Sequence, residues 1–252
     1  MGRKIVMGLT SHRQALPGTE AASLDLADQA ISERKPLKPF TDIITILDRS
    51  GSMESIRTDT EGGFNAFVQK QRESHGDCAL SLYQFDDVYE VVYENRPIAQ
   101  VPPLQLEPRN MTALLDAIGS TVNARGAYYD SLPEAERPEK VVVVVMTDGE
   151  ENSSREFNLE TVRKLITRQR EVYKWEFIFL GANMDAVAEG ARMGFQASKS
   201  MNYAPDGEGV MYCMASASDL VSNFKMKLIG EAMDDFSAED RAKSGGKKKR
   251  RG

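Results

Sequence analysis

Two short apolar runs, each ending in a polar turn, constrain the fold of this chain more than any other feature. Val141 to Met146 contains no polar residue, which is typical of a parallel strand whose two faces are both covered by helices. Ile43 to Leu47 is a second, largely apolar run, and helical patterns separate the two from further candidate strands. The sequence therefore predicts an α/β fold with a doubly wound, mostly parallel central sheet and helices on both faces.

The two runs lead directly into residues that carry oxygen atoms. The first ends in Asp48-Arg49-Ser50-Gly51-Ser52 and the second in Thr147-Asp148-Gly149, while Thr112 opens a helical pattern between them. Along an extended chain, Asp48, Ser50 and Ser52 point the same way. Open α/β sheets bind ligands at the carboxyl ends of their strands, so these side chains can converge on one hard cation such as Mg²⁺, Mn²⁺ or Ca²⁺.

Each of these residues has a simpler interpretation when it is taken alone. An Asp or Ser that follows a strand often only forms a turn or caps a helix. The D-x-S-x-S pattern is also short enough to arise by chance. A metal site is favoured because the three segments occur together, in order, each at the end of an apolar run or the start of a helical one.

Taken together, the residues resemble the metal-ion-dependent adhesion site (MIDAS) of the von Willebrand factor A domain family, over roughly Phe40 to Met233. The resemblance implies a Rossmann-like sheet with one antiparallel strand. It also implies five metal-site residues, of which the hydroxyls bind the ion directly and the carboxylates act largely through water: Asp48, Ser50, Ser52, Thr112 and Asp148. Asn110 stands where the family commonly has Gly, and Asn is the next most tolerant residue of a positive φ.

Further strands and domain limits follow from local patterns. Cys78 to Phe85 and Val88 to Tyr93 flank a tight Asp86-Asp87 turn and are predicted to pair antiparallel, with the neighbouring acids solvated. Residues 1–39 are interpreted as an N-terminal arm or linker, 40–236 as the von Willebrand factor A domain and 237–252 as a flexible basic tail. A helix is expected over Gly209 to Met233, with its methionines filling gaps in the core.

Composition limits where the protein works and what it binds. The chain has no apolar run of about 18 residues and no signal-peptide core, so we expect a cytoplasmic protein without membrane attachment. Its two cysteines, Cys78 and Cys213, are expected to be buried thiols. The net charge is −6 although residues 241–252 hold seven basic and no acidic side chains. The acidic remainder argues against nucleic-acid binding, except weakly through the basic tail.

The resemblance implies a protein-binding module in which a partner offers an Asp or Glu to the bound ion. Such a module can act as an adaptor in a larger assembly, including an AAA+ ATPase. Arg49 and Met53 are expected to shape the rim that this partner contacts. The passage from Phe177 to Phe195 further resembles free-standing prokaryotic and phage members of the family.

Two other functions stay open at this stage. A metal-dependent hydrolase of phosphoryl groups could use the same ion to activate water. No His lies near the ligand segments and no P-loop is present, so we expect the protein not to be an enzyme. A virion or assembly component with a vestigial metal site is the second alternative.

Overall fold

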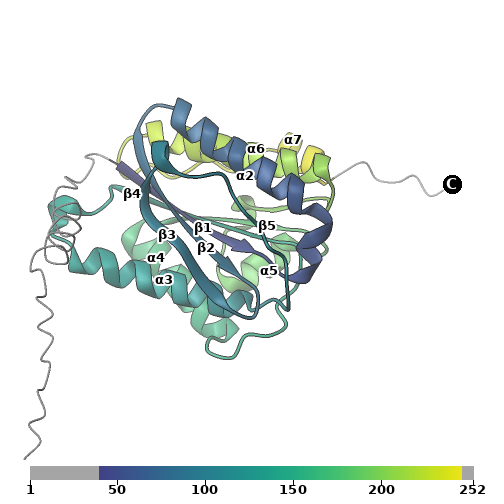
Figure 1. Cartoon of the computed structure of the whole chain (residues 1–252). Coiled ribbons are helices and arrows are strands. Elements are labelled where there is room, and N and C mark those ends of the chain that lie inside the picture. Colours follow the sequence, from purple (N-terminus) through teal and green to yellow (C-terminus); the bar gives the residue numbers. More distant parts are fainter. Residues whose placement is uncertain (1–39, 246–252) are drawn as a thin grey trace, which may run out of the picture. The chain divides into compact units, whose positions relative to one another are not determined.

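The structure, a computed structural model, describes residues 40 to 245 (Figure 1). The arm predicted over residues 1–39 and the basic residues 246–252 lie outside the described residues. The described part is built on a six-stranded sheet with the order β3-β2-β1-β4-β5-β6. Its strands are β1 (Phe40–Asp48), β2 (Asp77–Phe85), β3 (Tyr89–Pro97), β4 (Lys140–Thr147), β5 (Glu176–Gly181) and β6 (Ser200–Asn202).

All neighbouring strands run parallel except β2 and β3, which pair antiparallel as the tight turn between them predicts. The register places Asp48 of β1 opposite Phe85 of β2, and Leu47 opposite Met146 of β4. The carboxyl ends of these three strands are therefore level with one another. The predicted fold class, a mostly parallel sheet with one antiparallel strand, is confirmed.

Helices cover both faces of the sheet (Figure 1). On one face lie α2 (Arg57–Glu73), α6 (Gly207–Met226) and α7 (Ala238–Ser244), and on the other α3 (Leu114–Ser131), α4 (Leu159–Tyr173) and α5 (Ala186–Met193). Short 3₁₀ turns precede or join these elements at Gly51–Ile56, Ile98–Gln100, Glu134–Glu136 and Ala197–Lys199.

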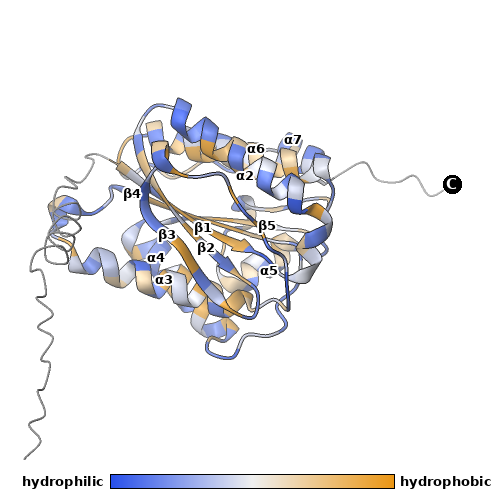
Figure 2. Cartoon of the chain, viewed as in Figure 1, coloured by the Kyte–Doolittle hydropathy of each residue, from blue (hydrophilic) through white to orange (hydrophobic). Residues whose placement is uncertain are grey.

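The alternation of β1 explains how one strand serves two cores. Ile43 and Leu47 belong to the cluster under α2 and α6, whereas Ile44 and Ile46 belong to the cluster under α3, α4 and α5. All of β4 is buried, as expected for a central strand of this kind. In Figure 2 the strands are mostly hydrophobic in colour and much of the helix surface is hydrophilic.

Local capping signals in the sequence are confirmed at two helices. The Asn158 side chain accepts a hydrogen bond from the Thr161 amide at 2.9 Å at the start of α4. Gly194 ends α5 with a φ of 99°, in the left-handed region that favours glycine. Cys78 and Cys213 are buried and free, also as predicted.

The last long helix ends earlier than predicted. It stops at Met226, after which the backbone is extended at Lys227. The Lys140 ammonium, from the start of β4, donates to the carbonyls of Phe224 and Lys225 at this end, at 2.9 and 3.0 Å. Met226 and Met211 are 64% and 55% exposed, so the prediction that they fill the core is wrong. Met214, in contrast, is buried in the core.

The domain also extends beyond residue 236, so the boundary predicted there is too early. Ser237 begins α7 with a capping box in which its side chain bonds the Asp240 amide and the Asp240 side chain bonds the Ser237 amide. At the other end of α7, Ser244 is fully buried and its hydroxyl donates to the Asn202 carbonyl at 2.9 Å. Residues 237–245 therefore belong to the folded domain. Within residues 40–245, no helix is both long enough and apolar enough to cross a membrane.

Candidate metal centre

The carboxyl ends of β1 and β4 bring the first and last predicted site residues together. Asp48 is buried, and its Oδ2 accepts a hydrogen bond from Thr147 Oγ1 at 2.6 Å. Its other oxygen, Oδ1, accepts from the Ser50 amide at 2.6 Å, which turns the chain at the end of β1. Residues 99 positions apart in the chain thus meet because the two strands are parallel neighbours.

The predicted hydroxyl groups lie beside these carboxylates. Ser50 Oγ and Ser52 Oγ are 3.1 Å apart, and Ser52 Oγ donates to Asp148 Oδ1 at 2.6 Å. Thr112 arrives from a third segment, because a Cβ atom placed on Gly149 would lie 3.4 Å from Thr112 Oγ1 and 3.7 Å from Ser52 Oγ. The structure therefore gathers all five predicted residues at one edge of the sheet.

Backbone hydrogen bonds hold the Thr112 segment against the loop after β1. The amides of Gly51 and Arg109 donate to the carbonyls of Asn110 and Arg49, at 3.2 and 2.8 Å respectively. Asn110 has a φ of 59°, so the positive φ expected at this position is confirmed. An Asn side chain tolerates this conformation, and the loop keeps its course without the Gly that the resemblance leads one to expect.

Three polar residues that the sequence did not single out complete the scaffold. Asn152 accepts from the Thr112 amide at 2.9 Å through its side chain. Glu151 accepts from the Leu115 amide at 2.9 Å, and Asp116 accepts from the amide of Phe157 at 2.7 Å. Local sequence patterns do not reveal these contacts, because the partners lie 36 to 41 residues away.

The two site carboxylates have no cation of their own. Among residues 40–245, no Lys, Arg or His forms an ion pair with Asp48 or Asp148. Burial raises the pKa of Asp48 to about 6, against the lowering effect of its hydrogen bonds to Thr147 and Ser50. Burial also raises the pKa of Asp148. The ionised site thus concentrates negative charge that nothing in this part of the chain neutralises.

Neither a protein-family model nor a curated protein matches the chain. Solved structures match, among them the mussel byssus proximal thread matrix protein 1 with a zinc-occupied MIDAS motif, with a TM-score of 0.52, 14% identity and coverage of 73% of this chain and 46% of that one. The described domain has the von Willebrand factor A fold.

Two further structures lead to the same fold. A von Willebrand factor type A structure from Catenulispora acidiphila gives a TM-score of 0.51 at 13% identity, covering 73% of this chain and 43% of that chain. The von Willebrand factor domain of the type V pili tip protein Mfa5 from Porphyromonas gingivalis gives a TM-score of 0.51 at 9% identity. The match covers 77% of this chain and 98% of that chain. This chain spans less than half the length of the mussel and Catenulispora proteins.

The residues at this edge of the fold suit a hard divalent cation. Hydroxyl and carboxylate oxygens are the ligands that Mg²⁺, Mn²⁺ and Ca²⁺ prefer. Within residues 40–245 no three His, Cys, Asp or Glu side chains come together in a metal-binding group. A metal at this edge would therefore depend on Ser and Thr hydroxyls, which are weak ligands for softer ions.

The rim around the site differs from the prediction in two residues. Arg49 is only 5% exposed, because its Nε donates to Asp86 Oδ2 at 3.2 Å and it also pairs with Glu90. Met53 is fully buried in the core. The prediction that both form a partner-contacting rim is wrong for Met53. For Arg49, which lines a groove beside the metal loops, it stays a prediction.

Asp86 is likewise not the solvated turn residue that was expected. Its side chain is fully buried and also accepts from Arg109 Nε at 2.6 Å and from the Val88 amide at 2.6 Å. The turn after β2 is therefore tied to the metal loops by two arginines. Their guanidinium groups neutralise Asp86 and Glu90, and neither is available to Asp48 or Asp148.

Proposed function

We propose that this domain is a divalent-cation-dependent protein-binding module. The observation that supports it most directly is the pair of buried carboxylates without a cationic partner, beside three converging hydroxyls. Burying a charge without compensation is costly, so a fold that retains two such groups favours an external cation. The zinc-occupied MIDAS motif of the mussel protein, which shares the fold, supports the same proposal.

In this proposal Ser50, Ser52 and Thr112 hold the ion directly, and Asp48 and Asp148 do so largely through water. We favour Mg²⁺ or Mn²⁺, with Ca²⁺ as a third candidate. Neutral hydroxyl ligands leave most of the ion's charge unneutralised. Bound there, the ion would supply an attraction for a carboxylate, and an Asp or Glu of a partner protein is the ligand that matches it.

We propose binding rather than catalysis because, within residues 40–245, no histidine lies at the site to act as a general base. His75 is the histidine within residues 40–245, and it lies just before β2, at the strand end opposite the site. Incubation with generic phosphate esters and Mg²⁺ tests the alternative hydrolase. Turnover that Asp48→Asn abolishes would replace binding by phosphoryl-group hydrolysis as the function.

As a module of a larger assembly, the domain would act as an adaptor, and an AAA+ ATPase is one assembly that fits this role. The test is affinity capture from the native host with the wild-type domain, in Mg²⁺ and in EDTA. A partner should be retained only with Mg²⁺ and lost with Ser52→Ala. Ser55→Ala, an exposed serine three residues further on, serves as the matched control and should retain it.

Capture that is equal in Mg²⁺ and EDTA, or equal for the two serine variants, would contradict a metal-dependent interaction. Absence of any metal binding by the wild-type domain would favour the remaining alternative, a virion or assembly component with a vestigial site.

A further inference from the structure

A groove of about 580 Å³ lies beside the metal loops, on the sheet face that carries α2. Its lining includes Val92 and Tyr93 of β3, and Pro102 and Pro103 of the segment after β3. Arg49 and Arg109 line it as well. Because Arg49 lies between Asp48 and Ser50, and Arg109 precedes Asn110, the groove is continuous with the loops that form the candidate metal centre.

Two residues that line this groove each carry a buried polar atom that has no hydrogen-bond partner within residues 40–245. Tyr93 Oη and Arg49 Nη2 are both buried and make no hydrogen bond within residues 40–245. Tyr93 is 9% exposed and Arg49 is 5% exposed, so water gives them little compensation. Buried donors are almost always satisfied in native proteins, and two such atoms in one groove indicate that a ligand supplies the acceptors.

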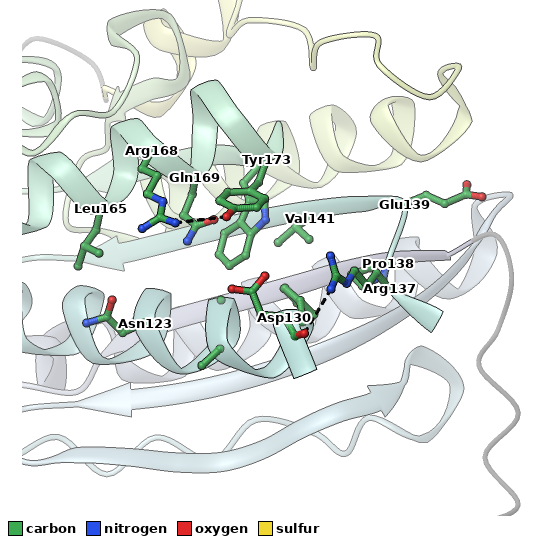
Figure 3. A pocket seen from close by; sticks show the side chains of 14 residues that line it. Asn123, Asp130, Arg137, Pro138, Glu139, Val141, Leu165, Arg168, Gln169 and Tyr173 are labelled. Atoms are coloured by element: carbon green, nitrogen blue, oxygen red, sulfur yellow. Dashed lines mark hydrogen bonds between the residues drawn. The ribbon is translucent and has the colours of Figure 1, made fainter. Parts of the chain in front are cut away.

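The hollow shown in Figure 3 differs in this respect. It has a volume of about 330 Å³ and lies between the ends of α3 and α4, at the amino end of β4. None of the buried unpaired polar atoms of residues 40–245 belongs to its lining. Its arginines already donate, Arg137 to the Leu132 carbonyl and Arg168 to Tyr173 Oη. The groove beside the metal loops is therefore the better ligand site.

The charges in the groove determine which acceptors it would take. Arg49 is paired with Asp86 and Glu90, and Arg109 is paired with Asp86, so the guanidinium charges are already balanced. A further carboxylate would gain little here. Neutral carbonyl oxygens satisfy the two donors without adding charge, and the Pro and Val walls suit apolar side chains.

We propose that this groove binds an extended, apolar segment of the partner protein, adjacent to the acidic residue that reaches the metal, through the carbonyl oxygens of its backbone. This inference rests on the proposed function, since it assigns a second contact to the same partner. The acidic residue provides the metal-dependent part of recognition. The groove provides a part that depends on shape and hydrogen bonding.

The test uses a random 12-residue peptide library displayed on phage and selected on the wild-type domain with Mg²⁺. Two substitutions probe the groove. Tyr93→Phe removes only the unpaired hydroxyl, and Val92→Glu places a charge on a side chain that is 41% exposed. Tyr128→Phe on α3 and Val172→Glu on α4 are the matched controls, at exposed positions outside the groove.

Selected peptides should bind about three- to tenfold more weakly to Tyr93→Phe, the equivalent of one hydrogen bond, and more than tenfold more weakly to Val92→Glu. Both controls should bind like wild type. Thermal unfolding separates this role from a structural one, because loss of a structural hydrogen bond of Tyr93 would lower the melting temperature. Since the Tyr93 hydroxyl has no partner within residues 40–245, Tyr93→Phe should leave the melting temperature unchanged or raise it slightly.

The remaining variants separate this proposal from the one on which it rests. Peptides that need Mg²⁺ and Ser52 but ignore both groove substitutions would overturn the groove and leave the metal-dependent function standing. Peptides that respond to the groove substitutions but not to EDTA or Ser52→Ala would support the groove and overturn the metal-dependent function. If no peptide distinguishes Val92→Glu from wild type, the groove proposal fails.

Discussion

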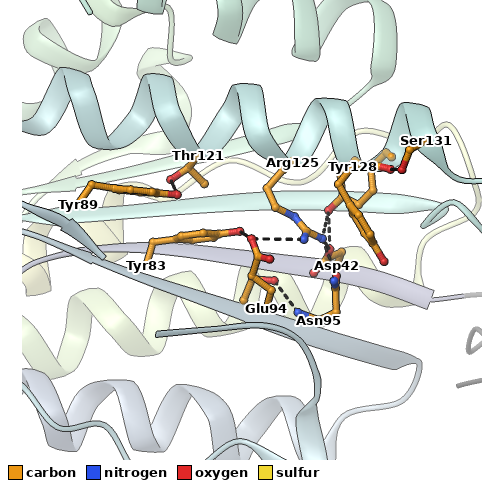
Figure 4. Close-up of polar contacts among 11 residues, drawn as sticks. Asp42, Tyr83, Tyr89, Glu94, Asn95, Thr121, Arg125, Tyr128 and Ser131 are labelled. Carbon is orange, nitrogen blue, oxygen red and sulfur yellow. Dashed lines mark hydrogen bonds and ion pairs between the residues drawn. The ribbon is translucent and has the colours of Figure 1, made fainter. Parts of the chain in front are cut away.

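Strand β1 carries a buried carboxylate near each end, and the two differ in whether a cationic side chain bonds them. Near its beginning, Asp42 Oδ2 accepts from Arg125 Nη2 and from Tyr129 Oη, each at 2.5 Å (Figure 4). The same Arg125 nitrogen donates to Asn95 Oδ1 at 2.6 Å. At the other end, Asp48 is equally buried, and it accepts hydrogen bonds from the Thr147 hydroxyl and the Ser50 amide.

The difference lies in where the compensating positive charge comes from. Arg125 is 1% exposed and is positioned by α3, so the cation for Asp42 is part of the folded chain. Asp48 and Asp148 have hydroxyls around them and no such cation within residues 40–245. The charge of Asp42 is therefore compensated from within the chain, whereas in the proposed function Asp48 receives its compensating charge from a bound ion.

The largest expected effect is at the Asp42 end. Arg125→Met leaves Asp42 buried without its cation and should lower the free energy of unfolding by about 3–5 kcal/mol. Urea denaturation monitored by circular dichroism measures the loss. The double variant Asp42→Leu with Arg125→Met removes both charges and should recover much of it. A loss below about 1 kcal/mol in the single variant would show that Asp42 does not depend on this partner.

The next effect is at the Asp48 end and requires metal. At a Mg²⁺ concentration one hundred times the dissociation constant, the wild-type domain should gain about 2.7 kcal/mol by mass action. Ser52→Ala and Asp148→Ala should remain folded and respond weakly or not at all, while Ser55→Ala responds like wild type. Thermal unfolding at stepped Mg²⁺ and Mn²⁺ concentrations, with EDTA as the zero point, measures this. Equal shifts in all variants would mean that the ion binds elsewhere.

Without metal, a pH dependence of stability should also distinguish the Asp48 end of β1 from the Asp42 end. Burial raises the pKa of folded Asp48 from 3.8 to about 6, so the folded state holds this proton more tightly than the unfolded state. The contribution of Asp48 to stability therefore falls as the pH rises from about 4 through 6. Asp48→Asn should remove this loss and make the EDTA-treated domain more stable than wild type at pH 7.5, by on the order of 1 kcal/mol.

With Mg²⁺ present, the stability of the domain should instead increase as the pH rises, because the ion needs ionised carboxylates. The metal-induced rise in melting temperature of the wild type should grow as the pH passes through about 6. Thermal unfolding between pH 5 and 8, with EDTA and with Mg²⁺, gives both quantities. A difference between Asp48→Asn and wild type that does not change with pH would show that Asp48 does not titrate in this range.

The smallest effects come from one asparagine at each end with a left-handed backbone. Asn110, beside the metal loops, has a φ of 59°, and Asn95, beside Arg125, has a φ of 49°. Asn110→Gly should change stability by no more than about 0.5 kcal/mol and keep the response to Mg²⁺. Asn95→Gly eases the same backbone conformation but removes the acceptor for Arg125, and should cost about 1 kcal/mol. Equal costs for the two would contradict a distinct role for Asn95.

Much of the fold follows from patterns that are local in the chain. The apolar content of Val141 to Met146 indicates a central strand, Asp86-Asp87 indicates a tight antiparallel turn, and Asn158 and Gly194 mark helix ends. The candidate site was also accessible from the sequence. Its three segments each follow or precede a predictable element, and parallel strands place their carboxyl ends at one edge.

Which charged side chains pair with one another could not be predicted from local sequence patterns. Arg49 and Asp86 looked exposed because each lies in a polar turn, yet they meet across 37 residues and are buried. The boundary at residue 237 failed for the same reason, since Ser244 is buried and bonds Asn202, 42 residues away, as well as Ala204.

What the sequence determined by itself, then, is most of the strands and helices, the left-handed position of Asn110 and the oxygen-rich ends of two strands. Each depends on neighbouring residues and on the steric limits of the backbone. The tertiary structure alone decided which carboxylates receive a cation from the chain. Arg125 reaches Asp42 across 83 residues, while Asp48 and Asp148 meet hydroxyls. That outcome depends on which helix crosses which end of the sheet, and so on the packing of the domain as a whole.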